Sequence, residues 1–204
     1  MRFLVRLANR HGTSPADRKR LSKAAYEAVR RFGADVGNLR VSSSAIEFDL
    51  LLESEKKLQE SLKLLEGQMG ALLTLRKLDV PSPPIPDQEA IRLGLDLFNE
   101  ERYWESHEAL ESAWREAEGD EKEILQGLIL LAAALVHWQK NEKQVTLSVM
   151  KRAFEKLVPH PEEHFGIDMA ALTDTLSRML DSGEPEFLKL TLVKAQDHSN
   201  SEAR

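Results

Sequence analysis

Apolar residues follow two different spacings along this chain, and the change between them falls near residue 80. Before it, short segments of alternating apolar and polar positions, typical of half-buried strands, are interspersed with segments in which apolar residues recur every three or four positions, typical of helices. We expect strands near 3–8, 39–41, 46–50 and 72–75, and helices over about 14–33 and 54–67. The order β-α-β-β-α-β predicts a ferredoxin-like α+β domain over residues 1–79.

Individual residues set the expected ends of these segments. Ser14 is followed by a proline and by Asp17, a pattern that predicts a helix N-terminus with a capping box. Gly33 and Gly67 are expected to end the two helices, because glycine readily adopts the left-handed conformation found at helix C-termini. The serines at 42–44 lie between two strand-like segments and predict a hairpin.

Four of the eight prolines lie between residues 80 and 87, where they predict an extended Pro-rich linker between two domains. After this linker the spacing is helical throughout. Helices joined by short turns are expected over residues 87–98, 103–118, 121–140, 142–157 and 168–180. Short turns make consecutive helices antiparallel neighbours, so we predict an all-α antiparallel helical bundle over residues 88–190 and a disordered tail over 191–204.

The segment 124–138 is apolar on nearly all sides. Such a helix is either central in a bundle or covered on its outer side by a second subunit, which leaves a homo-oligomer through this helix as an alternative. Gly127 within the segment predicts a close approach by another helix, because glycine has no side chain to keep a neighbour away.

Charge is distributed unevenly between the two halves. The net charge is −6, but residues 1–80 hold 15 Lys or Arg against 10 Asp or Glu, whereas the remainder holds 13 against 24. We favour two domains that attract each other over a surface that binds a polyanion, because no basic run exceeds residues 18–20.

The absence of cysteine excludes disulfides, thiol nucleophiles and cysteine-bearing zinc sites. No segment resembles a signal peptide or a membrane span, so no membrane association is expected and a cytoplasmic location is the default.

The most distinctive chemistry lies in the predicted helix 103–118. Residues three or four apart on a helix are neighbours, so Tyr103, His107 and Glu111 share one stripe. Antiparallel packing across a turn near residue 119 brings this stripe opposite helix 121–140. We therefore predict a polar pocket between the two helices, formed by aromatic, imidazole, carboxylate and amide side chains: Tyr103, Trp104, His107, Glu108, Glu111, Trp114, Gln126 and His137.

Three roles are compatible with this cluster. A His–Glu network inside a bundle can be purely structural, because buried polar groups must be paired, and this is the role we favour for the residues themselves. The cluster can also be the pocket of a binding or interaction module whose partner is an unidentified small molecule or protein. The third role is that of a metal-dependent or acid/base hydrolase using His107 with Glu108 or Glu111. A binding module is favoured over a hydrolase, since no nucleophile or metal motif is complete.

The two metal-binding motifs that this segment most resembles are both incomplete. The segment 107–111 resembles the zincin motif, which requires a second histidine where this chain has Glu111. Neither histidine of the predicted pocket has a glutamate three residues earlier, as the di-iron motif requires. His160 and His164 lie among prolines and glutamates and are expected in an exposed loop. We therefore predict no metal and no cofactor.

A nucleic-acid partner is disfavoured by the sequence. The predicted strands lack paired exposed aromatic residues of the kind that stack bases, because Phe48 is assigned to the core. The sequence contains no glycine-rich phosphate-binding loop. Weak nucleic-acid binding through the basic N-terminal domain is kept as an alternative.

The helical half also resembles a known family. The residues that carry the resemblance are Phe98-Asn99, Tyr103-Trp104-Glu105, His107-Glu108, Leu110-Glu111, Trp114-Arg115, Gln126-Gly127-Leu128-Ile129 and Asn141. Over about residues 88–182 the chain is similar to domain of unknown function 309, which implies an all-α antiparallel bundle and no established activity. Glu101 occupies a turn position where the family often has glycine, and residues 143–145 replace a Gly-Ala pair.

Overall fold

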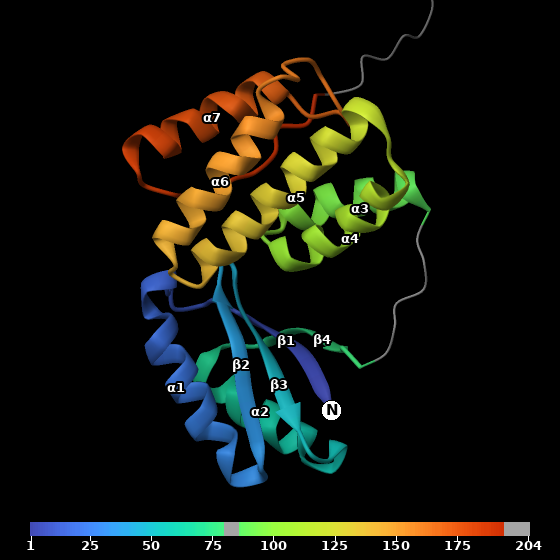
Figure 1. Ribbon diagram of the computed structural model, residues 1–204. Helices are drawn as coiled ribbons and strands as arrows, with labels where there is room; N and C mark the ends of the chain where they lie inside the picture. Colours follow the sequence, from blue (N-terminus) through green and yellow to red (C-terminus); the bar gives the residue numbers. More distant parts are fainter. Residues whose placement is uncertain (80–85, 194–204) are drawn as a thin grey trace, which may run out of the picture.

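The computed structural model describes residues 1–79 and 86–193, to which all structural statements below refer. A four-stranded antiparallel sheet with its two helices is followed by a helical region (Figure 1). The elements of the first half are β1 (Arg2–Ala8), α1 (Arg18–Val29), β2 (Ala34–Val41), β3 (Ala45–Leu52), α2 (Leu58–Met69) and β4 (Leu72–Lys77). The strands lie in the order β2-β3-β1-β4, and all neighbouring pairs are antiparallel.

The two faces of the sheet differ in character. One face packs against α1 and α2 in a hydrophobic core, to which the strands contribute Phe3, Val5, Leu7, Leu39, Val41, Ile46, Phe48 and Leu50. Side chains alternate between the two faces of a strand, so the residues in between point away from these helices. The opposite, polar face carries the charged residues Arg40 of β2, Glu47 and Asp49 of β3 and Arg76 of β4, with the buried apolar Leu4 of β1 among them.

The start and end of the α1 segment agree with the sequence prediction. The carboxylate of Asp17 accepts the backbone N–H of Ser14 at 3.0 Å, and this hydrogen bond lowers the pKa of Asp17. One turn of 3-10 helix (Pro15–Asp17) then leads into α1. Gly33, whose φ is 70°, ends a second 3-10 turn that follows α1.

β2 is longer than the sequence predicts. The strand was expected over 39–41, and its missed first part includes Gly37 and Asn38, which are poor strand formers. The pairing with β3 is irregular between Gly37 and Arg40, and Asn38 has a positive φ of 52°. The hairpin through residues 42–44 is confirmed, since β2 and β3 pair directly on either side of it.

The predicted end of α2 at Gly67 is wrong. The helix continues to Met69 and is followed by Gly70, whose φ is 138°. Gly67 is exposed, and a Cβ there would meet nothing within 4 Å. No contact therefore requires glycine at this position, and its only effect on the helix is the low helix propensity of glycine. At Gly70 a Cβ would lie 2.0 Å from the carbonyl oxygen of Ala8, so the close approach to β1 requires glycine there.

The second half contains α3 (Asp87–Asn99), α4 (Tyr103–Glu116), α5 (Gly119–Gln139), α6 (Lys143–Leu157) and α7 (Met169–Ser182). Each helix from α3 to α6 packs on the next, and α7 packs on α6, around a hydrophobic core separate from that of the sheet. Gly127 of α5 allows the predicted close approach, since a Cβ there would lie 2.5 Å from the side chain of Leu157. No described helix is both long and apolar enough to cross a membrane.

The chain after α7 returns along the helical half in an extended conformation. Leu192 forms an isolated bridge with Ile167, and the N–H of Val193 donates to the carbonyl of Gly166 at 2.7 Å. The first residues of the tail predicted over 191–204 therefore have defined backbone partners, because they pair with the turn before α7. The rest of that tail and most of the predicted linker lie outside the described residues, at 194–204 and 80–85.

Candidate functional site

Tyr103, the first residue of α4, faces the core of the helical half. It is fully buried, and its hydroxyl donates to the backbone carbonyl of Leu188 at 3.1 Å. Its ring packs edge-on against Phe98, with the ring centroids 4.9 Å apart. Burial raises the pKa of Tyr103, so the hydroxyl stays protonated and available as a donor. Tyr103 thus holds the C-terminal extended segment against the helices.

Asn99, at the end of α3, binds the same segment. Its side-chain amide donates to the carbonyl of Leu190 at 3.3 Å, and its side-chain oxygen accepts the N–H of Leu190 at 2.7 Å. The side chain therefore satisfies both backbone groups of a residue that has no strand beside it. Two residues that carry the family resemblance, Asn99 and Tyr103, have structural partners.

Trp104 lies at the junction between α4 and the sheet. The guanidinium carbon of Arg40 is 5.3 Å from its ring centroid, and that of Arg76 is 5.5 Å away. Both arginines come from the polar face of the sheet. Cation–π contacts contribute about 0.5–1 kcal/mol each when exposed and more when desolvated, so Trp104 helps to bind the two halves together.

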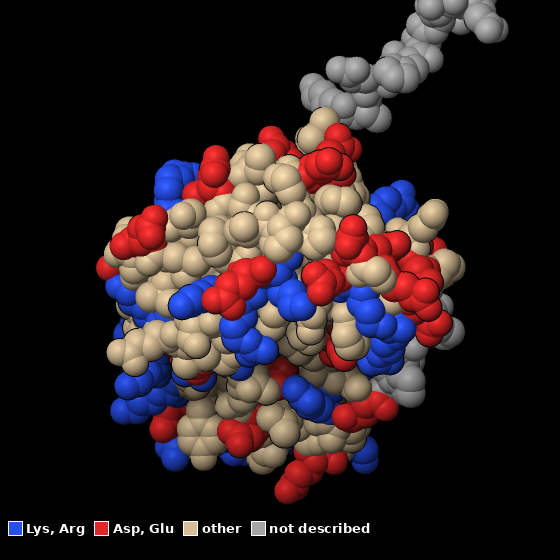
Figure 2. All heavy atoms as spheres, turned by 45° about the horizontal axis from the view of Figure 1, so that its top comes forward, with Lys and Arg blue, Asp and Glu red and all other residues tan. Residues whose placement is uncertain are grey.

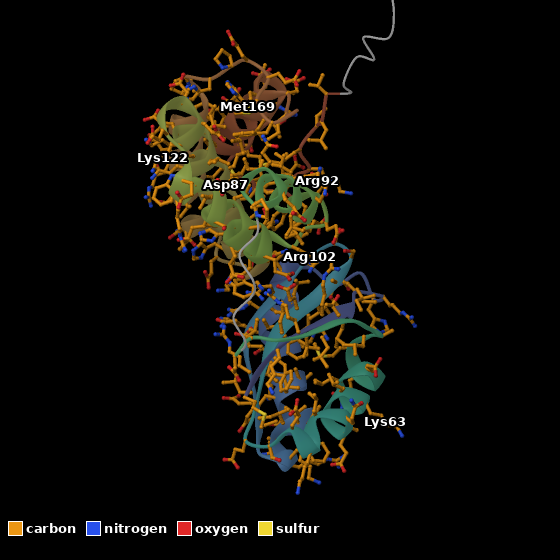
Figure 3. The ribbon with its side chains drawn as sticks, turned by 90° about the vertical axis from the view of Figure 1, so that its right-hand side faces the viewer. Lys63, Asp87, Arg92, Arg102, Lys122 and Met169 are labelled. Atoms are coloured by element: carbon orange, nitrogen blue, oxygen red, sulfur yellow. The ribbon has the colours of Figure 1, made fainter. Side chains whose placement is uncertain are left out.

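Acidic residues of α4 pair with the same face of the sheet. Glu105 lies 3.7 Å from Arg76 and forms two shorter hydrogen bonds, of 2.7 and 2.8 Å, with Arg102. Glu108 also lies 3.7 Å from Arg76. Burial raises the pKa of Glu108, while the charge of Arg76 opposes this shift. Figure 3 shows Arg102 where the two halves meet. The opposite charges that face each other across the junction are those of Arg76 in the sheet and of Glu105 and Glu108 in α4.

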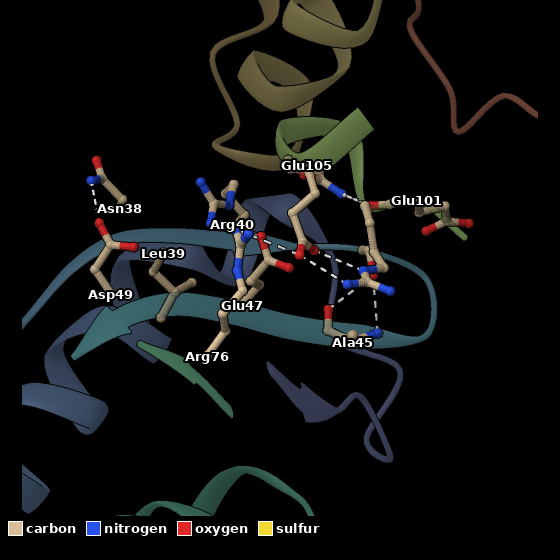
Figure 4. Close-up of polar contacts among 12 residues, drawn as sticks. Asn38, Leu39, Arg40, Ala45, Glu47, Asp49, Arg76, Glu101 and Glu105 are labelled. Atoms are coloured by element: carbon tan, nitrogen blue, oxygen red, sulfur yellow. Dashed lines mark hydrogen bonds and ion pairs between the residues drawn. The ribbon is translucent and has the colours of Figure 1, made fainter. Parts of the chain in front are cut away.

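A buried ion pair of the sheet lies against this junction (Figure 4). Arg40 Nη2 and Glu47 Oε1 are 2.6 Å apart, and both side chains are largely shielded from solvent. Burial raises the pKa of Glu47 and outweighs the opposing charge of Arg40. Removing one partner of such a pair leaves an uncompensated charge, so the pair constrains what can pack on this face.

Glu101 connects the turn before α4 to the hairpin of the sheet. It has a left-handed φ of 59°, which explains why glycine suits this position in the resembling family. Its carboxylate accepts the backbone N–H of Ser43 at 2.7 Å and the Ser43 hydroxyl at 2.5 Å, and its own carbonyl accepts the side-chain amide of Gln139 at 2.7 Å. The sequence shows that Glu101 occupies a position where the resembling family often has glycine, but it does not reveal this contact across the junction.

The other predicted pocket residues have local partners: Glu111 with Arg115 at 3.6 Å, Trp114 with Lys122 at 5.1 Å, and His137 with Glu142 at 2.5 Å. His107 and Gln126 are partly exposed. Tyr103 and His137, which were predicted to line one pocket, are each bonded elsewhere. A single pocket formed by all eight residues stays a prediction.

His160 is not in the exposed position that the sequence predicts. Its side chain is 10% exposed, and its Nε2 lies 3.7 Å from the Glu123 carboxylate, because the loop after α6 folds against α5. The rings of His160 and His164 are 6.1 Å apart. Across residues 1–79 and 86–193, no group of three or more His, Asp or Glu residues is arranged to hold a metal ion.

A groove of about 390 Å³ separates α1 from the edge strand β2. Its lining combines basic, hydroxyl and aromatic side chains: Arg18, Lys19, Ser22, Lys23, Tyr26, Asp35 and Val36. Arg18 is held in place because its Nε donates to the carbonyl of Leu39 at 3.0 Å. The one acid of the lining, Asp35, accepts the N–H of its neighbour Val36 at 2.7 Å. The groove is therefore open to solvent on a predominantly cationic surface.

The segment that contains α1, which lines this groove, is rich in positive charge. Residues 10–31 contain seven Lys or Arg and two Asp or Glu, and both acids are paired, Asp17 with Arg20 at 2.9 Å and Glu27 with Arg30 at 2.6 Å. In the space-filling view, acidic side chains are frequent at the right of the visible face, and basic ones are interspersed among them over its left, centre and right (Figure 2). The two halves therefore differ in net charge, with both signs present over the visible face.

The cationic region continues toward the helical half. Lys140 follows α5, and its pKa is lowered by burial and by the charges of Arg40 and Arg18. The positive charges of Arg18 and Arg40 disfavour the protonated form of Lys140, and a bound anion would offset this repulsion. The groove and Lys140 together form the strongest candidate for an anion-binding surface.

Comparison with known proteins identifies the helical half. The family described as Domain of unknown function (DUF309) matches residues 91–149, from α3 into α6. Residues 91–149 of the helical half are thus identified as a DUF309 segment. The DUF309 match includes the residues that contact the C-terminal segment, Asn99 and Tyr103, and those that contact the sheet, Trp104, Glu105 and Glu108.

A solved structure is also similar to this chain. It is the crystal structure of a conserved hypothetical protein from Thermus thermophilus, with 36% sequence identity and a TM-score of 0.39. The similarity covers 48% of this chain and 98% of that protein. No curated protein matches the chain.

Proposed function

We propose that this protein binds single-stranded nucleic acid, and that the groove between α1 and β2 is the binding site. The observation that carries the proposal is the cationic lining of the groove, where Lys19 and Lys23 are exposed and have no ion-pair partner among the described residues. Such cations attract the phosphates of a nucleic-acid backbone, and their association releases counterions. In this proposal the groove acts as a binding site.

The neutral residues of the groove suit a nucleic acid better than a lipid surface. Tyr26 is 43% exposed, so its ring is available for stacking on an unpaired base. The hydroxyl of Ser22 is a suitable donor to a phosphate oxygen. Helices that bind membranes present several large apolar residues on one face, whereas Tyr26 is the large apolar residue that α1 exposes.

The proposal includes a division of roles between two domains, a ferredoxin-like domain at residues 1–79 and a helical bundle at 88–190. The strand order β2-β3-β1-β4, the two helices on one face and the separate hydrophobic cores support this division. The acidic helical domain repels phosphates from its own surface and leaves the groove of α1 as the attractive region. A cytoplasmic location is consistent with such a ligand.

Of the eight residues of the predicted helical pocket, Trp104 and Glu108 contact the sheet, and in this proposal their role is to hold the junction rather than to bind a ligand. Trp104 and Glu105 contact the sheet, and Tyr103 contacts the C-terminal segment. The carboxylates suggested for a hydrolase, Glu108 and Glu111, lie near Arg76 and Arg115. These contacts support a structural role for the family motif and give no support to hydrolysis.

The test measures binding of a fluorescent 12-nucleotide oligouridylate by anisotropy at 50, 100 and 200 mM salt. Three cations in the groove predict a plot of log affinity against log salt with a slope of about −2, since each phosphate contact with a single strand contributes about −0.7. The double variant Lys19→Ala/Lys23→Ala should reduce the slope to about −0.7. Tyr26→Ala should weaken binding by about fivefold or more without changing the slope.

The matched control is Lys63→Ala/Lys151→Ala, which removes the same charge from exposed positions on α2 and α6. Figure 3 shows Lys63 in the sheet half, on α2. The control should retain both the affinity and the slope of the wild type. Equal losses in the two double variants, binding that does not depend on salt, or binding to anionic lipid vesicles in preference to the oligonucleotide would each contradict the proposal.

A further inference from the structure

A second groove lies in the helical half and differs in character from the first. It has a volume of about 470 Å³ and is bordered by α3, the turn before α7 and the C-terminal extended segment. Ile91 and Leu95 of α3 line it and are buried, whereas Leu192 and Val193 line it and are 46% and 43% exposed. A volume between about 300 and 1,000 Å³ with apolar walls is typical of small-molecule sites.

The polar residues of this groove carry an excess of negative charge. Asp96 and Glu121 line it together with one cation, Arg92, and one amide, Gln88, and all four are exposed. Figure 3 shows Arg92 on the helical half, well away from the sheet. The half to which the groove belongs is itself acidic, with 24 Asp or Glu against 13 Lys or Arg after residue 80. The field at this groove therefore favours a cation.

The wall formed by the turn before α7 is conformationally unusual. Phe165 and Gly166 are consecutive residues with positive φ, 54° and 74°. An aromatic residue rarely adopts this conformation, and residues held in it cluster at ligand sites. The turn is fixed by the hydrogen bond from Val193 to Gly166, so Phe165 is held at the groove by the segment that forms the adjoining wall.

We infer that this groove binds a small organic cation with an apolar body, such as an arylalkyl ammonium. The apolar body contacts Leu95, Phe165 and Leu192, and the ammonium group lies toward Asp96 and Glu121 at the rim. The site is independent of the nucleic-acid groove on α1, from which it differs in charge, in lining and in the half of the chain that provides it.

Three probes with the same apolar body test the inference: 4-phenylbutylamine, 4-phenylbutanol and 4-phenylbutyrate. Each is titrated into the full chain and followed by NMR shifts of the Leu, Ile and Val methyl groups. The amine should bind most tightly, the alcohol more weakly and the carboxylate most weakly, with shifts centred on Ile91, Leu95 and Leu192. Equal binding of the three probes, or shifts centred elsewhere, would overturn the assignment.

Variants separate the charge interaction with the ammonium group from the apolar contacts with the rest of the ligand. Asp96→Asn/Glu121→Gln should weaken amine binding about three- to tenfold and leave alcohol binding unchanged, because only the charge interaction is lost. Leu192→Ser should weaken both. The control Glu162→Gln/Asp174→Asn removes the same charge from exposed positions outside the groove and should change neither. A chain that ends at Val193 and binds the amine tenfold more tightly than the full chain would assign the groove to the chain's own C-terminal residues and reject the inference.

Discussion

Glu101 and Ser43 lie 58 positions apart in the sequence, yet the carboxylate of one accepts both the backbone N–H and the hydroxyl of the other. The contact joins the turn before α4 to the β2–β3 hairpin, and Glu101 is only 7% exposed. Glu101 thus connects the two halves of the protein although its left-handed backbone conformation is unfavourable for a residue other than glycine.

Replacing either residue should lower the free energy of unfolding. Ser43→Ala removes one charge-assisted hydrogen bond and should cost about 1.5–3 kcal/mol in chemical denaturation. Glu101→Ala and Glu101→Gly both remove the carboxylate, but the glycine variant should be about 1 kcal/mol more stable because φ is 59° there. Equal stabilities of the alanine and glycine variants would show that the left-handed conformation is not retained.

The buried Glu47 predicts an unusual dependence of stability on pH. Its pKa is raised above the ordinary value of 4.5 on folding, so its contribution to stability is fully present below 4.5 and is lost as pH rises through the raised value. The wild type should therefore gain stability relative to Glu47→Gln as pH falls from 7 toward 4.5. Urea titrations of both proteins at several pH values measure this difference, and a constant difference would disprove the shift.

The charge pairs at the junction predict that the two halves associate in trans. Residues 86–204 should fold when expressed alone, because the helical half has its own hydrophobic core, and should show a cooperative thermal transition. Calorimetry should detect binding to residues 1–79 that weakens as salt rises, since Arg76 pairs with Glu105 and Glu108. Binding that is insensitive to salt would assign the association to apolar contacts such as those of Trp104.

The two helical glycines Gly127 and Gly67 predict opposite effects of the same substitution. Gly127→Ala places a Cβ 2.5 Å from the buried side chain of Leu157 and should destabilise the protein by about 1–3 kcal/mol through overpacking. Gly67→Ala meets nothing within 4 Å and should stabilise it by about 0.5–1 kcal/mol through helix propensity. Thermal melts should show a lower melting temperature for Gly127→Ala and a higher one for Gly67→Ala than for the wild type.

Tyr103 and Glu111 distinguish a structural role from a shared pocket. Tyr103→Phe leaves the buried carbonyl of Leu188 without its donor and should cost about 1–3 kcal/mol. Glu111→Ala removes a half-exposed side chain paired with Arg115 and should change stability by no more than about 0.5 kcal/mol. A large effect of Glu111→Ala in the same denaturation assay would instead support a network between α4 and α5.

The sequence predicts the fold well where neighbouring residues determine the structure. The pair Ser14 and Asp17, the hairpin at 42–44 and the apolar segment 124–138 each contain the pattern that defines their element. The first part of β2 was missed because its conformation depends on pairing with β3, whereas Gly37 and Asn38 disfavour a strand locally.

The surroundings of the candidate pocket could not be predicted in the same way. Helical spacing shows which residues share a face of α4, but it does not show what covers that face. Trp104 and Glu105 are covered by a sheet that is distant in sequence, and Tyr103 is covered by the segment around Leu188. The unusual Glu101 was the available indication of a contact, because a residue other than glycine at such a turn requires a compensating interaction.

The extended segment that binds Asn99 also brings the C-terminal end of the helical half next to its first helix. Its residues Leu192 and Val193 line the same groove as Gln88, in the first turn of α3, so the first and last parts of this half lie side by side. A unit with adjacent ends can be appended to or inserted into another protein without disturbing either fold. The adjacent ends of the helical half suit a unit that can be inserted into other proteins, and in this chain it contacts the sheet through α4 and the turn before it.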